Sequence, residues 1–385
     1  MTKPASEMQK TIWDNPSDII RSRAPDHPVM AFSPLALEAT ARRFLDGFPG
    51  QVTYAVKSNP DPSIIRVLYK TGVTGFDVAS PAEIDLIGQI APAAARHYHN
   101  PVRASAEIAH AAKAGIRAWS VDSQSELAKI IARVPPDGVE ISPRFKLPVS
   151  GAIYDFGSKF GAPPELAVTL LQEVAARGFT PSLTFHPGTQ CTDPAAWESY
   201  IRTAGDIATQ AGITPARLNV GGGFPSHRVT GAAPDLEAIF ALIARVTRET
   251  FGASAPALVC EPGRGLCADA FSLITRVKAL RDGQTIFLND GVYGGLSELP
   301  IVGNLDRIEV LDPKGQPRRG EPLSRTIFGP TCDSVDRLPG ELDLPEDLKD
   351  GDYVIFHGAG AYSTATNTRF NGFGEMEHLT VRALG

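Results

Sequence analysis

Residues 53–59 read Thr53-Tyr54-Ala55-Val56-Lys57-Ser58-Asn59, a stretch that predicts a short buried strand ending on a lysine. Its larger apolar residues alternate with smaller ones, and Pro60 cannot continue the hydrogen bonding of a strand. Burying an ammonium group costs free energy, so a lysine is unusual at the end of an apolar strand. A desolvated lysine has a lowered pKa and can form a Schiff base with an aldehyde. Lys57 is therefore a candidate nucleophile, and the alternative is a surface lysine just beyond the strand.

The chain has 385 residues, enough for one large domain and a smaller one. Its formal net charge is -6 and no run of Lys or Arg forms a basic patch, so nucleic acid is not expected as a partner. No apolar stretch resembles a signal peptide or reaches the ~18 residues of a membrane span, which favours a cytoplasmic protein without a membrane partner. The cysteines lack metal-ligand spacing, so we expect reduced thiols and no metal.

The middle of the chain alternates between strand-like and helical patterns. A helix is expected to begin at Pro34, with Ser33 as its N-cap residue. Strands are predicted near residues 52–57, 75–79, 96–100, 117–121, 140–145, 182–186, 217–221 and 257–261. Helices are predicted over 63–70, 81–89, 105–114, 125–134, 164–176, 194–211 and 236–251. This α/β pattern is typical of a (β/α)8 TIM-like barrel, and a doubly wound open sheet is the competing architecture.

A C-terminal, mainly β domain is predicted beyond the barrel. Strand-like runs lie at 271–280, 285–288, 307–311, 353–357 and 377–383, with few helical stretches between them. The first 31 residues include a weak strand pattern at 29–31, have no place in the barrel and are expected to pair with this domain. The predicted domains are therefore a barrel over 32–268 and a β-rich domain formed by 1–31 and 269–385.

Several residues that could take part in catalysis or ligand binding lie at the ends of the predicted barrel strands, where the active sites of such barrels lie. They are Lys57, Asp77, Arg144, His186, Gly221-Gly222-Gly223 and Glu261. The glycines would let backbone amides approach a phosphate, although tight turns use glycine too. Glu261 could charge a pyridine nitrogen and Arg264 could bind near a phosphate, or the two could form a structural pair. His186 could stack on a planar cofactor or be a structural histidine. Taken together, the combination indicates a pyridoxal phosphate site.

The chain resembles the pyridoxal-phosphate-dependent decarboxylases of the alanine-racemase fold, in the ornithine/lysine/diaminopimelate group. The residues that carry this resemblance span almost the whole chain. They are Tyr54-Ala55-Val56-Lys57-Ser58-Asn59, Gly75-Phe76-Asp77-Val78-Ala79-Ser80, Phe185-His186-Pro187-Gly188-Thr189-Gln190-Cys191, Gly221-Gly222-Gly223-Phe224-Pro225, Glu261-Pro262-Gly263-Arg264, Asp290-Gly291-Val292-Tyr293-Gly294, Gly329-Pro330-Thr331-Cys332-Asp333, Gly360-Ala361-Tyr362 and Phe370-Asn371-Gly372-Phe373. The Gly-Pro-Thr-Cys-Asp and Phe-Asn-Gly-Phe motifs are most similar to the ornithine decarboxylase branch.

The resemblance implies a role for each matching residue. Lys57 would hold the cofactor covalently, Glu261 would pair with its ring nitrogen and His186 would stack on its ring. The other cofactor-binding residues would be Asp77, Arg144, Thr189, Gly222, Gly223, Gly263, Arg264 and Tyr362. Cys332 would protonate the substrate carbon, with Asp333 and Tyr293 binding the substrate. Cys332 and Asp333 would reach the site of a second subunit, so the resemblance implies a homodimer in which Lys159 faces Asp336 of the other chain.

One departure from the ornithine decarboxylase pattern concerns the acid that binds the distal amine of the substrate. Its place is taken by Val302, and Glu298 is the candidate replacement, while Gln190 could reshape the pocket. The expected function is decarboxylation of a basic L-amino acid, ornithine or lysine, to a diamine. Diaminobutyrate, arginine, diaminopimelate and a carboxylated polyamine remain alternative substrates. An amino-acid racemase is disfavoured by Cys332, and a non-catalytic partner-binding homologue by the retained cofactor residues.

Overall fold

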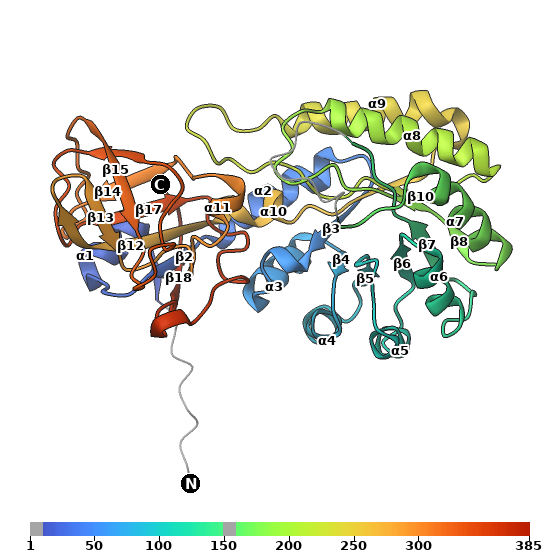
Figure 1. Ribbon diagram of the computed structural model, residues 1–385, viewed down its shortest axis with the longest axis horizontal. Coiled ribbons are helices and arrows are strands. Elements are labelled where there is room, and N and C mark those ends of the chain that lie inside the picture. The colour runs from blue at the N-terminus through green and yellow to red at the C-terminus, as the bar shows by residue number, and fades with distance from the viewer. Residues whose placement is uncertain (1–10, 149–158) are drawn as a thin grey trace, which may run out of the picture. The chain divides into compact units, whose positions relative to one another are not determined.

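The computed structural model describes residues 11–148 and 159–385. The chain divides into two units (Figure 1). The barrel unit comprises residues 38–227 and 231–267, and the β unit comprises the described residues up to Leu37 together with 228–230 and 268–385. This division differs from the predicted one at residues 32–37, 228–230 and 268. Residues 1–10 of the predicted 1–31 segment lie outside the described part of the chain.

The barrel unit is built on a 9-stranded sheet in the order β8-β7-β6-β5-β4-β3-β11-β10-β9. The strands are β3 (Gln51–Ala55), β4 (Gly75–Val78), β5 (Ala95–Tyr98), β6 (Ala118–Val121), β7 (Glu140–Pro143), β8 (Thr180–Pro181), β9 (Leu183–Thr184), β10 (Arg217–Asn219) and β11 (Ala257–Cys260). All of their pairings are parallel.

The two ends of this sheet are consecutive pieces of one extended segment. β8 pairs with β7, and β9 pairs with β10 only two residues later. A further bridge joins Arg144 to Thr184, so the same segment continues alongside the chain that follows β7. Because β8 and β9 share one position, the 9 strands fill eight places and the sheet closes on itself. The predicted (β/α)8 TIM-like barrel is confirmed, and the open-sheet alternative is wrong.

Helices connect the barrel strands, and α3, α4, α5 and α6 lie along the outside of β3–β7 (Figure 1). The helical segments are α2 (Pro34–Gly47), η1 (Val56–Ser58), α3 (Pro62–Thr71), α4 (Pro81–Ile90), α5 (Ser105–Lys113), α6 (Gln124–Ile131), α7 (Pro164–Ala176), α8 (Ala195–Ala211), α9 (Leu236–Phe251), η2 (Gly252–Ser254) and α10 (Arg264–Cys267). Helix α3 shows how the sequence sets their bounds. Asp61 caps its first turn by accepting from the Ser63 amide at 2.7 Å, and Gly72 ends it at a φ of 117°.

The β unit contains a second 9-stranded sheet with the central order β1-β18-β2-β12-β13-β15-β16, to which β17 and β14 are attached through β12. Its strands are β1 (Ile12–Trp13), β2 (Val29–Phe32), β12 (Phe271–Arg281), β13 (Thr285–Leu288), β14 (Ile308–Leu311), β15 (Pro322–Phe328), β16 (Leu342–Pro345), β17 (Tyr353–His357) and β18 (Glu377–Val381). Its helical segments are α1 (Pro16–Arg23), η3 (Ala268–Ala270), α11 (Leu299–Val302) and η4 (Phe370–Gly372). The mainly β second domain is confirmed. Strands β15 and β16 were not predicted, since a proline and charged residues obscure their apolar pattern.

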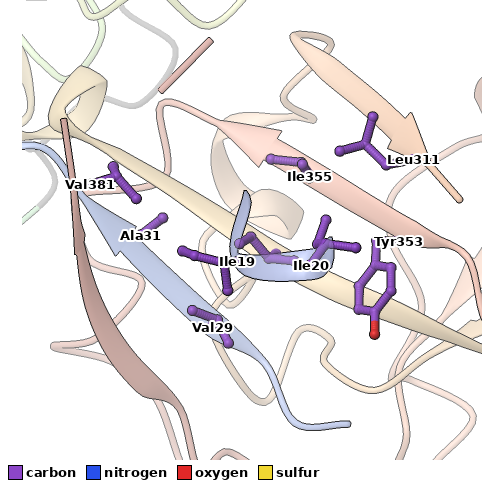
Figure 2. Packing of buried hydrophobic residues seen from close by; sticks show 9 residues of the cluster. Ile19, Ile20, Val29, Ala31, Leu311, Tyr353, Ile355 and Val381 are labelled. Atoms are coloured by element: carbon purple, nitrogen blue, oxygen red, sulfur yellow. The ribbon is translucent and has the colours of Figure 1, made fainter. Parts of the chain in front are cut away.

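The N-terminal segment is part of the core of the β unit. Strand β2 pairs with both β12 and β18, and β1 pairs with β18. Helix α1 places Ile19 and Ile20 against buried side chains of the sheet, among them Val29 and Ile355 (Figure 2). Burying such side chains stabilises the fold by roughly 1.5–3 kcal/mol each.

None of the helices in the described part of the chain combines the length and the apolar character that crossing a membrane requires.

Candidate active site

A cavity of ≈ 390 Å³ opens where the barrel strands end. Its lining residues come from several strands, as the position of a barrel active site predicts. They are Lys57, Asp77, Ala79, His99, Asn100, Pro101, Arg144, Lys159, Phe160, Thr184, Phe185, His186 and Glu261. The structure thus brings together five of the residues that the sequence singled out, namely Lys57, Asp77, Arg144, His186 and Glu261.

Lys57 does not end the strand as predicted. Strand β3 stops at Ala55, and Lys57 is the middle residue of the short 3-10 turn η1. The turn buries Val56 and Ser58 but leaves the Lys57 side chain exposed, contrary to the prediction of a buried lysine. Since Lys57 lines the cavity, its amine is accessible to a ligand there.

Glu261 is anchored by two neighbours inside the barrel. His99 Nδ1 forms a hydrogen bond with its Oε1 atom, and the Asn219 amide donates to the same oxygen at 2.5 Å. Glu261 and His99 are 9% and 7% exposed. Burial raises the pKa of Glu261, but the charge of His99 and the hydrogen bonds from His99 and Asn219 outweigh it and hold the pKa well below its usual range. Glu261 is therefore a buried carboxylate at neutral pH.

The pKa of Asp77 is shifted in the opposite direction to that of Glu261. Burial, followed by the nearby charge of Glu261, raises the pKa of Asp77 to about 7. Its Oδ1 atom and Nε2 of His99 are buried and make no hydrogen bond to any residue that the structure describes. Asp77, His99 and Glu261 each place a polar atom within 4.8 Å of the others. Burying polar atoms without hydrogen-bond partners costs free energy. A polar ligand that binds to this cluster could supply the missing partners.

His186 is half-buried in the same cavity. Burial, with the charges of Arg144 and Lys57 nearby, holds the pKa of His186 well below its usual range. Its Nδ1 atom accepts a hydrogen bond from the Gly188 amide at 3.1 Å, which places the ring proton on Nε2. A neutral imidazole held in this way can pack flat against an aromatic ring.

The glycine loop after β10 lies closely against its neighbours. A Cβ atom on Gly222 would come within 2.7 Å of the Glu261 carbonyl and 3.1 Å of His186 Nε2. Gly223 has a φ of +84°, and a Cβ there would lie 2.4 Å from the Gly188 carbonyl oxygen. Close packing against Glu261, His186 and Gly188 therefore gives a steric reason for the glycines, and phosphate binding by their amides remains a prediction.

The segment with Thr189 and Gln190 is tied to the glycine loop. The Gln190 side chain donates to the Ser226 carbonyl at 2.7 Å and accepts from the Ser226 amide at 3.1 Å, and the Cys191 amide donates to the Gly223 carbonyl at 2.8 Å. Gln190 is 6% exposed, so its side chain fastens two loops together. This arrangement counts against the hypothesis that Gln190 reshapes the pocket.

The segment after β11 is equally close-packed. A Cβ atom on Gly263 would lie 3.0 Å from the Ser58 side chain, so glycine lets this segment approach the turn that carries Lys57. Arg264, at the start of α10, is 6% exposed. These positions are compatible with the predicted cofactor roles of Gly263 and Arg264, which remain predictions.

The β unit carries the remaining predicted residues. Cys332 is an exposed free cysteine whose thiol donates to Asn371 Oδ1 at 3.2 Å. Tyr293 donates to Asp333 Oδ2 at 2.7 Å, and this bond holds the pKa of Asp333 below its usual range. The Tyr293 ring also contacts Phe370, with centroids 4.8 Å apart. A thiol and an ionised carboxylate thus stand next to each other on one ordered loop.

Asp336 organises this loop from within. Its carboxylate accepts from the Val292 amide at 3.0 Å, the Thr331 amide at 3.0 Å and the Thr331 hydroxyl at 2.8 Å. It is 1% exposed. These bonds count against the prediction that Asp336 faces Lys159 of a second chain, and Lys159 itself lines the barrel cavity.

Glu298 also has a partner within the β unit. It forms an ion pair with Arg228 at 2.8 Å, and Arg228 donates in addition to the Gly303 carbonyl at 2.7 Å. Val302, at the end of α11, is 7% exposed. The pairing counts against Glu298 as a ligand for a substrate ammonium, because the substrate would have to compete with Arg228.

Backbone strain coincides with the predicted site segments. Gln190, Tyr362 and Asn371 have φ values of 50°, 64° and 53°, in the left-handed region that favours glycine. Each such residue costs of order 1 kcal/mol or more and persists where the surroundings impose it. Ala24 and Asp282, outside these motifs, also have positive φ values, so the strain alone assigns no role, and the phosphate contact of Tyr362 remains a prediction.

The barrel, the lysine at its mouth, the buried carboxylate and the glycine cradle together define a pyridoxal-phosphate enzyme. A family model described as "Pyridoxal-dependent decarboxylase, pyridoxal binding domain" matches residues 36–268. Lysine/ornithine decarboxylase of Selenomonas ruminantium is 32% identical over 330 residues, covering 84% of this chain and 81% of the relative. Ornithine decarboxylase of Mus musculus is 33% identical over 356 residues, covering 86% and 75%.

Solved structures similar to this chain are also amino-acid decarboxylases. The arginine decarboxylase of Paramecium bursaria Chlorella virus has a TM-score of 0.84 at 26% identity, covering 94% of this chain and 98% of that one. Lysine/ornithine decarboxylase of Vibrio vulnificus complexed with cadaverine has a TM-score of 0.79 at 28% identity, covering 92% and 95%. The chain belongs to the pyridoxal-phosphate-dependent decarboxylase family, in its ornithine decarboxylase branch. It is an amino-acid decarboxylase whose cofactor is pyridoxal phosphate.

The residues present fit this cofactor. The cavity exposes the Lys57 amine, and the unpartnered Asp77 Oδ1 and His99 Nε2 atoms lie on residues of its lining. Two contributors, His99 and Asn219, were not identified from the sequence. Both could have been found, because they lie near the ends of the predicted strands 96–100 and 217–221, on the side where Glu261 lies. Asp336 was expected to face Lys159 of a second chain, and nothing in the neighbouring sequence marks it as a hydrogen-bond acceptor for two separate loops.

Proposed function

We propose that this enzyme decarboxylates a basic L-amino acid, ornithine or lysine, to the corresponding diamine in a homodimer whose subunits share each site. The pair Tyr293–Asp333 beside Cys332 is the observation that carries this proposal. It provides an ionised acid for a distal ammonium group and, at the next residue, a thiol that can donate a proton. The names of the relatives, which include lysine/ornithine and arginine decarboxylases, support a basic substrate.

The barrel residues would bind and orient the cofactor. Lys57 would hold it covalently, the amides of Gly222 and Gly223 would bind its phosphate together with Thr189, Arg264 and Tyr362, and Asp77, Arg144 and Gly263 would complete the site. When bound, pyridoxal phosphate acts as an electron sink for the α-carbon of an amino acid. Glu261 would hold a proton at the ring nitrogen, and neutral His186 would cover one face of the ring.

The β unit would act on the substrate. Asp333 would bind the distal ammonium, and its hydrogen bond from Tyr293 keeps it ionised for this purpose. Cys332 would donate its thiol proton to the α-carbon after carbon dioxide has left. We place these residues in the site of the second subunit, so that neither subunit alone would hold a complete site.

Val302 supports a second substrate class. An apolar residue stands where the resemblance places an acid for the distal amine, and Glu298 is already paired with Arg228. A buried ammonium without a partner is costly, so a substrate whose side chain differs from ornithine and lysine in length or in charged group is the alternative. Arginine, diaminobutyrate, diaminopimelate and a carboxylated polyamine are the candidates.

The test is a decarboxylation screen with purified protein and added pyridoxal phosphate over ornithine, lysine and these four alternatives. Lys57→Ala is the blank, because loss of the covalent lysine should reduce turnover by several orders of magnitude. Ornithine or lysine should give the highest specificity constant. Turnover confined to another amino acid would overturn the first substrate assignment and leave the family assignment intact.

A further inference from the structure

His99 has no role in the function described so far, although it contacts the central acid of the site. It directly follows β5, and its Nδ1 atom forms a hydrogen bond with Glu261 Oε1. Both residues line the cavity. Through this hydrogen bond His99 can act on the position and the charge of the Glu261 carboxylate.

Asn219 fixes the geometry of this contact. Its Oδ1 atom accepts from the Gly221 amide at 2.9 Å, so its Nδ2 atom must be the one that donates to Glu261 Oε1. The Asn219 amide also lies 3.1 Å from His99 Nδ1. The ionised Glu261 carboxylate has no proton to donate, so His99 Nδ1 must carry the proton of its hydrogen bond to Oε1, and its approach to Asn219 Nδ2 is a contact between two donors.

The charged groups around His99 come from several of the barrel strands. Glu261 follows β11, Asp77 lies in β4, and Glu140 in β7 contributes negative charge from further away. Burial lowers the pKa of His99, but these three acids, led by Glu261, outweigh burial and raise it. His97 precedes it in β5, with ring centroids 5.4 Å apart, and burial lowers the pKa of His97 to about 3.

Positive charge near the cluster comes from other residues. Arg217 of β10 acts on His97, while Arg144 and Lys57 lie at the cavity. With Asp77 and Glu261 both ionised and His99 protonated, this group of three side chains would carry one net negative charge. That charge equals the one needed to balance a protonated pyridine ring.

We propose that His99 is a positioning residue that fixes the orientation and the ionised state of Glu261, so that this carboxylate keeps the cofactor's ring nitrogen protonated. The proposal rests on the assignment of Glu261 to the ring nitrogen. Without His99, Glu261 would be a buried carboxylate that has lost its strongest partner, and it would take up a proton itself.

The experiment uses His99→Leu, which removes the donor, and His99→Gln, which retains a donor without charge. His97→Gln is the matched control, since His97 is buried in the same strand and has no hydrogen bond to Glu261 among the described residues. Two quantities are measured for each protein: the dissociation constant of pyridoxal phosphate for the apoprotein, and the ¹⁵N chemical shift of cofactor labelled at the ring nitrogen. Thermal unfolding of the apoprotein reports structural damage separately.

His99→Leu should raise the dissociation constant roughly 10- to 100-fold and move the ring-nitrogen shift toward that of unprotonated pyridine. His99→Gln should recover most of the affinity, and His97→Gln should leave both quantities near wild type. A His99→Leu protein with a lower melting temperature but unchanged affinity and nitrogen shift would show that His99 is only a core residue.

A Glu261→Gln variant separates this inference from the proposed role of Glu261. If Glu261→Gln moves the ring-nitrogen shift and His99→Leu does not, only the role of His99 is overturned. If neither variant moves it, the assignment of Glu261 fails as well. If His99→Leu does not fold, the proposal is tested on wild-type apoprotein with ¹⁵N-labelled histidine. A ¹⁵N chemical shift that shows Nδ1 of His99 unprotonated near pH 7.5 would contradict the proposal.

Discussion

The Arg228 guanidinium lies 2.8 Å from the Glu298 carboxylate, and the two side chains are only 4% and 12% exposed. An ion pair so removed from water is strongly coupled, because removing one partner leaves an uncompensated buried charge. A second bond from Arg228 to the Gly303 carbonyl attaches the pair to the end of α11. Glu298 therefore has a structural role in the segment where the sequence suggested a substrate ligand.

Glu298→Gln should consequently affect stability more than specificity. The amide can still accept a hydrogen bond from Arg228 but cannot neutralise it, so we expect the free energy of unfolding to fall by about 1–3 kcal/mol. Urea denaturation measures this change. Specificity constants for ornithine and lysine should shift by less than a few tenths of a kcal/mol. A loss of ~2 kcal/mol in both specificity constants would instead place Glu298 in the substrate pocket.

Cys332→Ala tests the proton donor. Without the thiol, the carbon that loses carbon dioxide should be protonated slowly or at the wrong position, so turnover should fall by roughly 10²–10⁴ and an aldehyde should appear among the products. Chromatography of the products measures the ratio. Ser334→Ala, in the next exposed part of the loop, is the control. An unchanged rate and product ratio in Cys332→Ala would assign this step to another group.

Mixed dimers test whether the sites are shared. Lys57→Ala and Cys332→Ala proteins, each inactive alone, should regain activity when their subunits exchange. At random pairing about a quarter of all sites would be complete, since half the dimers are mixed and each has one intact site of two. Native mass spectrometry confirms the exchange. If mixed dimers form and activity does not return, each site is built from a single subunit.

Asp77→Asn should change how the stability of the apoprotein depends on pH. Burial raises the pKa of Asp77 from 3.8 to about 7, so the folded protein holds this proton more tightly than the unfolded chain. The stability that the proton provides is complete at low pH and falls as the pH rises from about 4 to about 7. Asp77→Asn should therefore be more stable than wild type at pH 8, by on the order of 1 kcal/mol or more, and lose this advantage near pH 4. If Asp77→Asn and wild type differ in free energy of unfolding by the same amount at pH 8 and pH 4, Asp77 titrates normally.

Asp336→Ala should destabilise the β unit. The change leaves the amides of Val292 and Thr331 and the Thr331 hydroxyl without their acceptor, at an expected cost of about 2–4 kcal/mol in the free energy of unfolding. Asp336→Asn should cost less, because its oxygen can replace part of the acceptor capacity. Denaturant melts of the two variants measure the difference. Equal stability of Asp336→Ala and wild type would mean that these bonds contribute nothing net.

The sequence predicted the barrel well because each strand and helix has its own local pattern and cap, as Asp61 and Gly72 show for α3. It also identified the residues that carry reactive groups, since these follow the strands in order. The sequence did not reveal which groups bind one another. His99 and Asn219 meet Glu261 only because neighbouring strands place them together, and Glu298 meets Arg228 across a long separation in the chain. Such pairings depend on the register of the barrel strands and on the paths of the loops, which no local pattern records.

The bonds of Asp336 also have a consequence for evolution. One carboxylate connects the loop that carries Cys332 with the loop that carries Tyr293, so a mutation that moves one of them must be compatible with the other. Helix α11 is fastened by a separate pair, Arg228 and Glu298. Descendants of this fold can therefore accumulate changes in α11 while inheriting the loop that carries Cys332 unchanged.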